Sequence, residues 1–435
     1  MGVDWLMTID FVSRWLGLVV VIGFFVLVCF ELIRYFKTAF ERSDIVLSNR
    51  RFVSAGKVFG IVLLAFVLSR LFLVGVCAFA HMYDTNGFSD FLKTFMQKLD
   101  PWDADHYLDL MRDGYVADGE ARLFIVFFPF YPMVCRIFSF LTGFDVYYIA
   151  ILVSNVALII AGYMMFRVIE LEYNEGVAWK AIWFLMFSPF TYFYSIAYTE
   201  SVFLLVTLLS VYFAKKRQWV LSVLFGMCAS NCRLLGLAVA IPIFWEMLRY
   251  EQLQADENDM VTTFGDGFKR IVCCILRVLP VSFGFMLYLL LNWNVYRNPF
   301  QFLIYQSEHW HQNFGGLMNT VDYCLKNTFT YHDVWYRFGV WGPQVVTLVG
   351  VPLLILFSRR KAHADLAGYT LVYHYVAFMP TWLLSGVRYA SACYAFYPML
   401  SLIADKKWKF ALMFILELVF FVVIVYVGFW HVKVY

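Results

Sequence analysis

Apolar residues occur in long runs from one end of the sequence to the other, with short polar segments between them. A helix needs about 20 mostly apolar residues to cross the hydrocarbon core of a bilayer. The clearest runs of this kind are 11–33, 58–80, 146–169, 271–293, 342–357 and 410–430. This pattern predicts an all-α polytopic membrane protein.

Other apolar segments are shorter, or are interrupted by polar residues. They are 177–195, 201–214, 219–232, 234–248, 366–384 and 389–404. If each of these segments also crosses the bilayer, the chain has about 12 transmembrane helices.

Lysine and arginine gather in a few of the polar segments, and cytoplasmic loops of membrane proteins are enriched in these residues. The basic groups lie within 34–57, 215–217, 249–270, 359–361 and 406–409. With the spans given above, all of these groups fall on one side. We expect that side to be the cytoplasm, which places both ends of the chain outside.

Residues 124–141 are apolar enough to cross the bilayer, but a crossing here would move the basic group at 215–217 to the outside. Pro129 and Pro132 also interrupt a regular spanning helix. We therefore expect this segment to lie along or dip into the exoplasmic face. The large exoplasmic loops are then 81–143, the expected catalytic loop, and 294–341.

The composition agrees with a single membrane domain. Charged residues make up 15% of the chain, against about 25% in soluble domains, and no polar block is long enough to fold alone. We divide the chain into an additional N-terminal helix with its basic loop, 1–57, and a membrane domain, 58–435. The net charge of +3 is small and gives no support to nucleic-acid binding.

The acidic and aromatic stretch 100–115 is the most informative part of the exoplasmic loops. A short helix beginning near Asp103 would place His106 and Tyr107 on the same face as Asp103, whereas Asp105 would point away. That face could accept the proton of a hydroxyl group. The alternative is that Asp103 caps the helix and that Trp102 is an interfacial anchor.

Three further ionisable residues stand near the outer ends of expected spans. Glu200 lies at an outer mouth, and Arg233 and Arg388 lie at outer turns, the latter followed by Tyr389. Ionisable residues near membrane depth are functional candidates, and arginine binds phosphate through paired hydrogen bonds. The alternatives are a helix-start acid for Glu200 and arginines that extend to the interface.

Other polar residues are weaker candidates. Arg70 and Arg136 are two weaker candidates for contact with a phosphate. A metal site at His309, His311 and His332 is not predicted, because no carboxylate stands at ligand spacing and an i, i+2 pair diverges on a helix.

Four segments resemble the PIG-V family, the second mannosyltransferase of glycosylphosphatidylinositol assembly, and its bacterial relatives. They are WDADHY (102–107), FFPFYP (127–132), SPFTYFYSIAYTES (188–201) and NCRLLG (231–236), in the family order. The likeness covers about 58–250. It implies a GT-C fold, in which a sugar is taken from a polyprenyl-phosphate carrier at an exoplasmic site. The run 11–33 departs from the family pattern as an added helix.

The resemblance implies roles for particular residues. Asp103 would be the general base on an acceptor hydroxyl, His106 would orient it, and Glu200 would act as a second acid or shape the acceptor site. The donor phosphate would be bound by Arg388, Arg233 and Tyr389, and acceptor or loop support would come from Asp105, Tyr107 and Trp102. Direct displacement inverts the anomeric centre, so a β-linked donor gives an α-mannoside. No cofactor or metal is required, although a divalent metal is compatible with this chemistry.

The expected partners are a polyprenyl-phosphate mannose donor, a glycolipid or glycan acceptor and the bilayer. The sequence contains no Asn-x-Ser/Thr glycosylation site, which favours a bacterial plasma membrane with an outward-facing site over the endoplasmic reticulum with a lumenal one. Three alternatives stay open. They are a glycolipid flippase or transporter using Glu200 and His374, a transferase of another sugar, and an acyltransferase in which His374 is catalytic.

Overall fold

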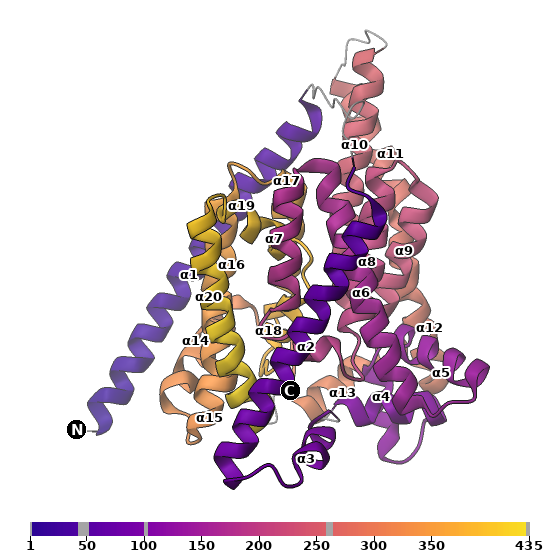
Figure 1. Ribbon diagram of the computed structural model, residues 1–435. Helices are drawn as coiled ribbons and strands as arrows, with labels where there is room; N and C mark the ends of the chain where they lie inside the picture. The colour runs from indigo at the N-terminus through magenta and orange to yellow at the C-terminus, as the bar shows by residue number, and fades with distance from the viewer. Residues whose placement is uncertain (1, 42–51, 100–102, 258–263, 432–435) are drawn as a thin grey trace.

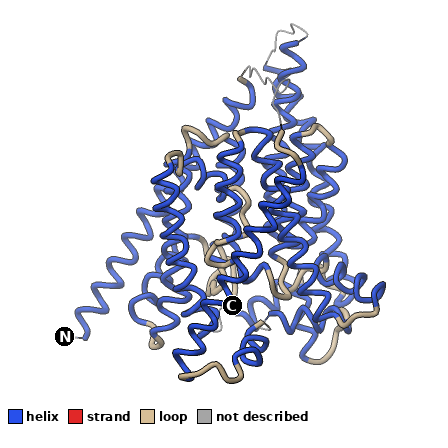
Figure 2. The backbone as a smooth tube through the Cα atoms, in the orientation of Figure 1, coloured by secondary structure: helices blue, strands red, loops and turns tan. Residues whose placement is uncertain are grey.

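The computed structural model describes residues 2–41, 52–99, 103–257 and 264–431, and these residues form helices joined by short loops (Figures 1 and 2). No strand occurs among them; the one β-contact is an isolated bridge between Phe314 and Pro380. An all-helical chain suits a bilayer, because each helix satisfies its backbone hydrogen bonds internally.

Six helical segments are long and apolar enough to cross a membrane. They are Met7–Phe40 in α1 (Gly2–Phe40), Ala55–Thr85 (α2), Val146–Glu172 (α6), Gly265–Tyr296 across α11 (Phe264–Val278) and α12 (Phe283–Tyr296), Val334–Ser358 ending in α16 (Gly342–Ser358), and Lys407–Val427 containing α20 (Lys407–Ile424). They coincide with the six clearest apolar runs of the sequence. The prediction of a polytopic membrane protein is therefore confirmed.

The other apolar segments form shorter helices, so the expected total of 12 spans is not confirmed. They are α7 (Glu175–Met186), α8 (Glu200–Lys215), α9 (Trp219–Cys232), α10 (Ala240–Glu257), α17 (Ala364–Phe378), α18 (Gly386–Ser391) and α19 (Phe396–Ile403). The expected span 177–195 is broken, because α7 ends at Met186 and Pro189 disfavours a helical residue before it. Likewise, 389–404 is divided between α18 and α19.

The segment 81–143 begins in the last turn of α2, and its described residues after Thr85 form a layer of short helices. It contains α3 (Phe91–Lys98), α4 (Asp103–Asp113), a 3₁₀ turn at Glu120–Val126 and α5 (Phe130–Thr142). The axes of the last two elements differ by 115°, with Pro129 preceding α5. Figure 1 shows α5 beside α4 at the end of the bundle that also holds α3.

The N-terminal helix α1 is attached to the rest of the bundle near both of its ends. Near its start, Lys326 lies 2.5 Å from Asp10 and Ser13 donates a 2.5 Å hydrogen bond to Asp322, both partners being on α14 (Leu317–Thr330). Towards its other end, buried Glu31 lies 3.3 Å from Arg359. The added helix is thus bound to the second large loop and to the end of α16.

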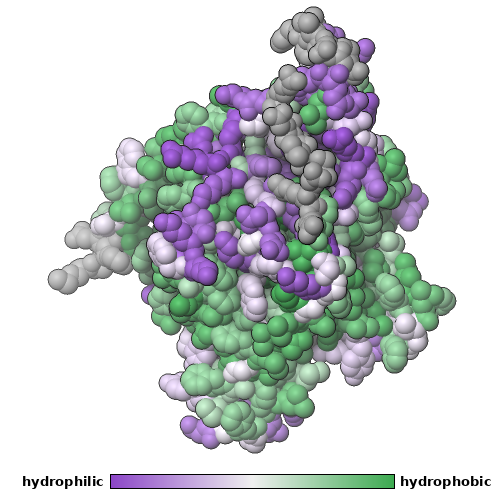
Figure 3. Space-filling view, turned by 45° about the horizontal axis from the view of Figure 1, so that its top comes forward, coloured by the Kyte–Doolittle hydropathy of each residue, from purple (hydrophilic) through white to green (hydrophobic). Residues whose placement is uncertain are grey.

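The basic groups that the structure describes meet at one end of the bundle. Arg34 of α1 donates to the carbonyl group of Ala362 beyond α16, and Lys361 and Lys409 lie 2.7 and 2.8 Å from Asp405. Figure 3 shows hydrophilic residues gathered on this end, with apolar residues below them. The clustering agrees with the predicted common side. That this side faces the cytoplasm stays a prediction.

Helices α9 and α12 approach so closely that glycine is required between them. A Cβ atom at Gly284 would lie 1.9 Å from the carbonyl oxygen of Met227. Asn231 donates a 2.7 Å hydrogen bond to the Gly284 carbonyl group, and Ser230 donates a 2.6 Å bond to that of Val281. Small residues and interhelical hydrogen bonds are typical of helix pairs within membranes.

We expect Gly284→Ala to destabilise the protein by about 2 kcal/mol or more, because the added methyl group forces two helix backbones apart. The measurement is the thermal unfolding midpoint of the detergent-solubilised protein. Gly60→Ala in α2 is the matched control, since a Cβ there meets no atom within 4 Å. Equal midpoints for the two variants would contradict the proposed close contact.

Candidate active site

Two carboxylates and two guanidinium groups from distant parts of the sequence form one chain of ion pairs. Arg388 Nη1 donates to Asp103 Oδ2 at 3.0 Å, and Arg388 Nε lies 3.4 Å from Glu200 Oε1. The same Glu200 oxygen accepts a 3.0 Å hydrogen bond from Arg233 Nη1. The order is therefore Asp103, Arg388, Glu200, Arg233. The two carboxylates and the two guanidinium groups together carry no net formal charge.

Asp103 is the most exposed member of this set. It is the first residue of α4, and 19% of its side chain is exposed, against 6% for Arg388. The buried face of α4 holds the helix against the bundle through Ala104, Leu108 and Met111. An acceptor molecule could therefore reach the carboxylate of Asp103 without displacing the helix.

Glu200 is fully buried at the start of α8. A negative charge is favourable at a helix N-terminus, but burial without partners would be costly. Oε1 is matched by both arginines, whereas Oε2 has no hydrogen-bond partner among the described residues. Glu200 is consequently the centre of the ion chain.

Arg233 lies where α9 ends and the backbone becomes extended, before a 3₁₀ turn at Leu234–Val239. Gly236 donates a 2.9 Å hydrogen bond to the carbonyl group of Arg233. A Cβ at Gly236 would lie 2.1 Å from the carbonyl oxygen of Ala229. This glycine allows the chain to fold back on α9, and that fold directs Arg233 towards Glu200.

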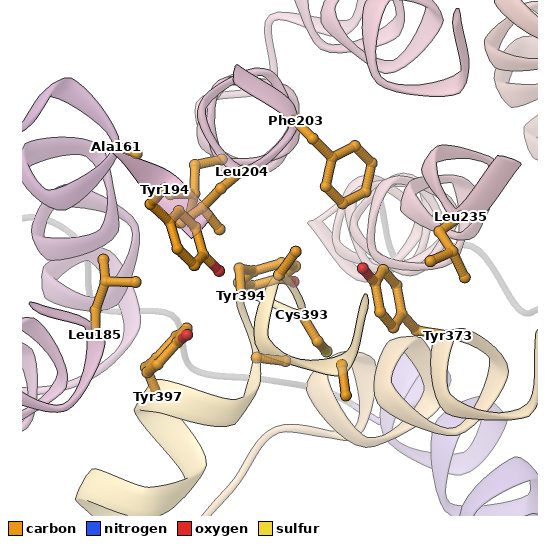
Figure 4. Close-up of a cluster of buried hydrophobic side chains, with 14 of the residues drawn as sticks. Ala161, Leu185, Tyr194, Phe203, Leu204, Leu235, Tyr373, Cys393, Tyr394 and Tyr397 are labelled. Atoms are coloured by element: carbon orange, nitrogen blue, oxygen red, sulfur yellow. The ribbon is translucent and has the colours of Figure 1, made fainter. Parts of the chain in front are cut away.

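Arg388 is carried by the short helix α18, whose carbonyl groups are bonded by buried tyrosines. Tyr194 and Tyr397 donate hydrogen bonds of 2.7 and 2.6 Å to the Ser391 carbonyl group, and Tyr373 donates a 2.8 Å bond to that of Tyr389. Figure 4 shows Tyr194, Tyr373 and Tyr397 within one buried cluster. These bonds hold a six-residue helix that could not be stable alone.

Aromatic rings cover the faces of both guanidinium groups. The ring centre of Tyr389 lies 4.8 Å from Arg233 and 5.0 Å from Arg388. Tyr198 and Phe193 lie 4.8 and 5.4 Å from Arg388. Contacts of this kind stabilise a buried cation. The sequence interpretation missed Tyr198 and Phe193, although the aromatic run before Glu200 could have indicated them.

His106 is not joined to Asp103 by any hydrogen bond in the described part of the chain. Its ring stacks on Phe124 at 4.5 Å and lies 5.6 Å from that of Phe127. The expected orienting contact therefore does not form in this structure. The packing of a ring on aromatic neighbours explains the position of His106 without a catalytic role.

The other residues expected on α4 differ in exposure. Tyr107 is buried, and its ring centre lies 6.0 Å from that of Tyr198. Asp105 is exposed. Burial raises the pKa of Tyr107 well above its usual value, so its hydroxyl group stays protonated. Trp102 lies outside the described residues.

The weaker arginine candidates lie outside the ion chain. Arg70 donates hydrogen bonds to the Thr191 carbonyl and hydroxyl oxygens at 3.0 and 2.6 Å, and another of 2.5 Å to Ser195. It therefore fixes the turn that leads to Glu200. Arg136 lies close to Gly114, just after α4.

The histidines considered for other chemistries are not brought together. His309, His311 and His332 are exposed. His374 is buried against Phe378 and Phe24, and neither ring nitrogen has a hydrogen-bond partner among the residues described. This apolar setting gives no support to an acyltransferase centre at His374.

Comparisons with known proteins assign no family. No protein-family model matches the chain, and no curated protein matches it significantly. The likeness to the PIG-V family therefore depends on the four sequence segments alone.

We expect Glu200→Gln to lower the free energy of unfolding by about 3 kcal/mol or more, because two buried guanidinium groups would lose their shared counter-charge. The thermal midpoint in detergent measures this effect. Glu308→Gln is the matched control, because Glu308 is exposed and has no ion pair among the described residues. An unchanged midpoint for Glu200→Gln would mean that the ion chain does not form in the folded protein.

Proposed function

We propose that this protein transfers mannose from a polyprenyl-phosphate donor to a glycolipid or glycan acceptor outside the membrane, with inversion at the anomeric carbon. One observation carries the proposal: a partly exposed carboxylate, Asp103, is connected through Arg388 and Glu200 to a second arginine, Arg233. A base and two cations in one site suit the attack of a hydroxyl group on a sugar phosphate. The resemblance to the PIG-V family supports the choice of sugar and carrier.

Asp103 takes the role of general base in this proposal. Its exposed edge receives the acceptor hydroxyl group, whose oxygen attacks the anomeric carbon while Asp103 accepts the proton. The bond between that carbon and the phosphate oxygen breaks, and its electron pair leaves with the polyprenyl phosphate. The reaction as written needs no cofactor or metal, because the leaving group is already a phosphate.

In this proposal the arginines bind the phosphate of the donor. A guanidinium group has five N–H donors. Arg388 donates from Nη1 to Asp103, whereas its Nε lies 3.4 Å from Glu200 and makes no hydrogen bond with a described residue. Its Nη2 has only a 3.4 Å contact with the Tyr389 hydroxyl group. Donors therefore remain on Arg388 for phosphate oxygens, and positioned cations stabilise the charge that develops there.

During the proposed reaction, negative charge is lost at Asp103 and gained by the phosphate, and Arg388 lies next to Asp103 in the ion chain. When Asp103 accepts a proton, its carboxyl group becomes neutral and no longer holds Arg388 by charge. At the same time, the departing phosphate gains one negative charge. Arg388 can then transfer its electrostatic pairing from the base to the leaving group, while buried Glu200 keeps both arginines in position.

We expect Asp103→Asn to reduce mannose transfer by about 100-fold or more, since general-base contributions are of this size. The assay measures transfer of labelled mannose from polyprenyl-phosphate mannose to membrane glycolipid extract, using purified protein of equal thermal midpoint. Asp109→Asn is the matched control on the same helix, because Asp109 is exposed and lies 3.7 Å from Arg112.

Retained transfer by Asp103→Asn would reject the assignment of the base. If the wild-type protein transfers another sugar from its polyprenyl phosphate instead of mannose, the donor assignment is wrong and the reaction class holds. If it transfers no sugar from any such donor, a lipid transporter becomes the better proposal, with Glu200 and the arginines as ligands for a phosphate headgroup.

We expect Arg233→Lys to raise the KM for the donor about tenfold, a loss of about 1.4 kcal/mol, and to leave the KM for the acceptor unchanged. Lysine keeps the charge that Glu200 needs but loses the planar group that binds phosphate oxygens in pairs. Steady-state kinetics with each substrate varied in turn measure both constants. A rise in the KM for the acceptor alone would assign Arg233 to the acceptor site instead.

A further inference from the structure

A second cluster of buried charges lies where α6 and α8 end and α17 begins, at the end of these helices away from Glu200. Lys215 Nζ is 2.6 Å from Glu172 Oε1, 2.9 Å from Glu246 Oε1 and 3.5 Å from Asp365 Oδ2. Only 3% of the Lys215 side chain is exposed. His363 adds an imidazole, with Nδ1 3.1 Å from Glu172 Oε1.

The charges of this cluster do not balance. Three carboxylates surround one ammonium group, and a protonated imidazole at His363 would still leave one negative charge in excess. Buried charges are normally paired or bound to metal ions. With all three carboxylates ionised, the cluster therefore carries more negative than positive charge, in contrast to the set around Glu200.

Asp365 shows where the missing charge would lie. Its side chain is fully buried, and Oδ1 has no hydrogen-bond partner in the described ranges. The buried hydroxyl group of Tyr394 is also without a hydrogen-bond partner among the described residues. A buried carboxylate oxygen without a hydrogen-bond partner among the described residues is an independent indication of a ligand.

The ligand atoms are close enough for one ion. One donor atom each from Glu172, His363 and Asp365 all lie within 4.8 Å of one another. Tetrahedral zinc, with bonds of about 2.0 to 2.2 Å, holds its ligand atoms about 3.3 to 3.6 Å from one another. Small side-chain rotations therefore suffice. The imidazole favours a transition metal over Mg²⁺ or Ca²⁺.

We propose that Glu172, His363 and Asp365 bind one divalent transition-metal ion, and we take Zn²⁺ as its representative. Two positive charges, a neutral imidazole and the Lys215 ammonium group then balance the three carboxylates. Lys215 keeps its contact with Glu246. The ion enters past His363, 35% of whose side chain is exposed, and it ties the end of α6 to the start of α17.

The test is the Zn²⁺ content of the full-length protein, purified in detergent without a histidine tag, stripped with chelator and dialysed against Zn²⁺. We expect one ion per chain by mass spectrometry, and binding at least tenfold weaker in His363→Gln and Asp365→Asn. Asp405→Asn is the matched control, because Asp405 is a paired acid at the same end of the bundle. Wild-type protein that binds no Zn²⁺ would overturn the proposal.

A second test uses the wild-type protein, so it remains valid if the variants fail to fold. Diethyl pyrocarbonate modifies accessible unprotonated imidazoles, and peptide mass spectrometry identifies the modified histidines. We expect Zn²⁺ to protect His363 and to leave exposed His309 and His311 reactive. Protection of those two residues instead, or of none, would place the ion elsewhere and refute the site. Neither measurement depends on glycosyl transfer.

Discussion

The buried carboxylate of Glu200 is the constraint on which the rest of the structure depends. It is fully enclosed, and a charge in that position is tolerated only when counter-charges reach it. Arg233 and Arg388 supply them from 33 and 188 residues away along the sequence. The fold must therefore end α9 at Arg233, hold α18 beside α8 and place α4 so that Asp103 meets the same guanidinium group. The end of α9 at Arg233 and the turn before Glu200 bring the charged groups together.

Helix α8 connects the two charged regions of the protein. It begins with Glu200 and ends with Lys215, and its 16 residues make it about 24 Å long at 1.5 Å per residue. An acid at its start and a base at its end both agree with the helix dipole. Between them lies an apolar core in which tyrosine hydroxyl groups bond to the backbone of α18 (Figure 4). The charged residues of α8 are therefore at its two ends, and most of the residues between them are apolar and buried.

Much of this architecture could be predicted from the sequence. Apolar length located the six long spans, and α9 has the predicted bounds, 219–232. The helix start at Asp103 followed from the local residues. Hydropathy could not show that α7 stops at Met186, because the interrupting turn is itself apolar. Nor could periodicity show that Asp103 and Arg388, 285 residues apart, form an ion pair. That contact depends on how several helices pack, and each of them is compatible with other neighbours.

The pairing of Asp103 with Arg388 also limits which reactions the site can perform. Arg388 lies 3.0 Å from the Asp103 carboxylate, and a proton taken up by Asp103 would remove the charge that pairs with this guanidinium group. A negative charge that appears nearby in the same step would replace the lost partner of Arg388. Loss of a phosphate leaving group supplies that charge. The sharing of Arg388 between proton transfer and departure of the phosphate is therefore an argument for the proposed displacement at a sugar phosphate, and against chemistry that creates no anion.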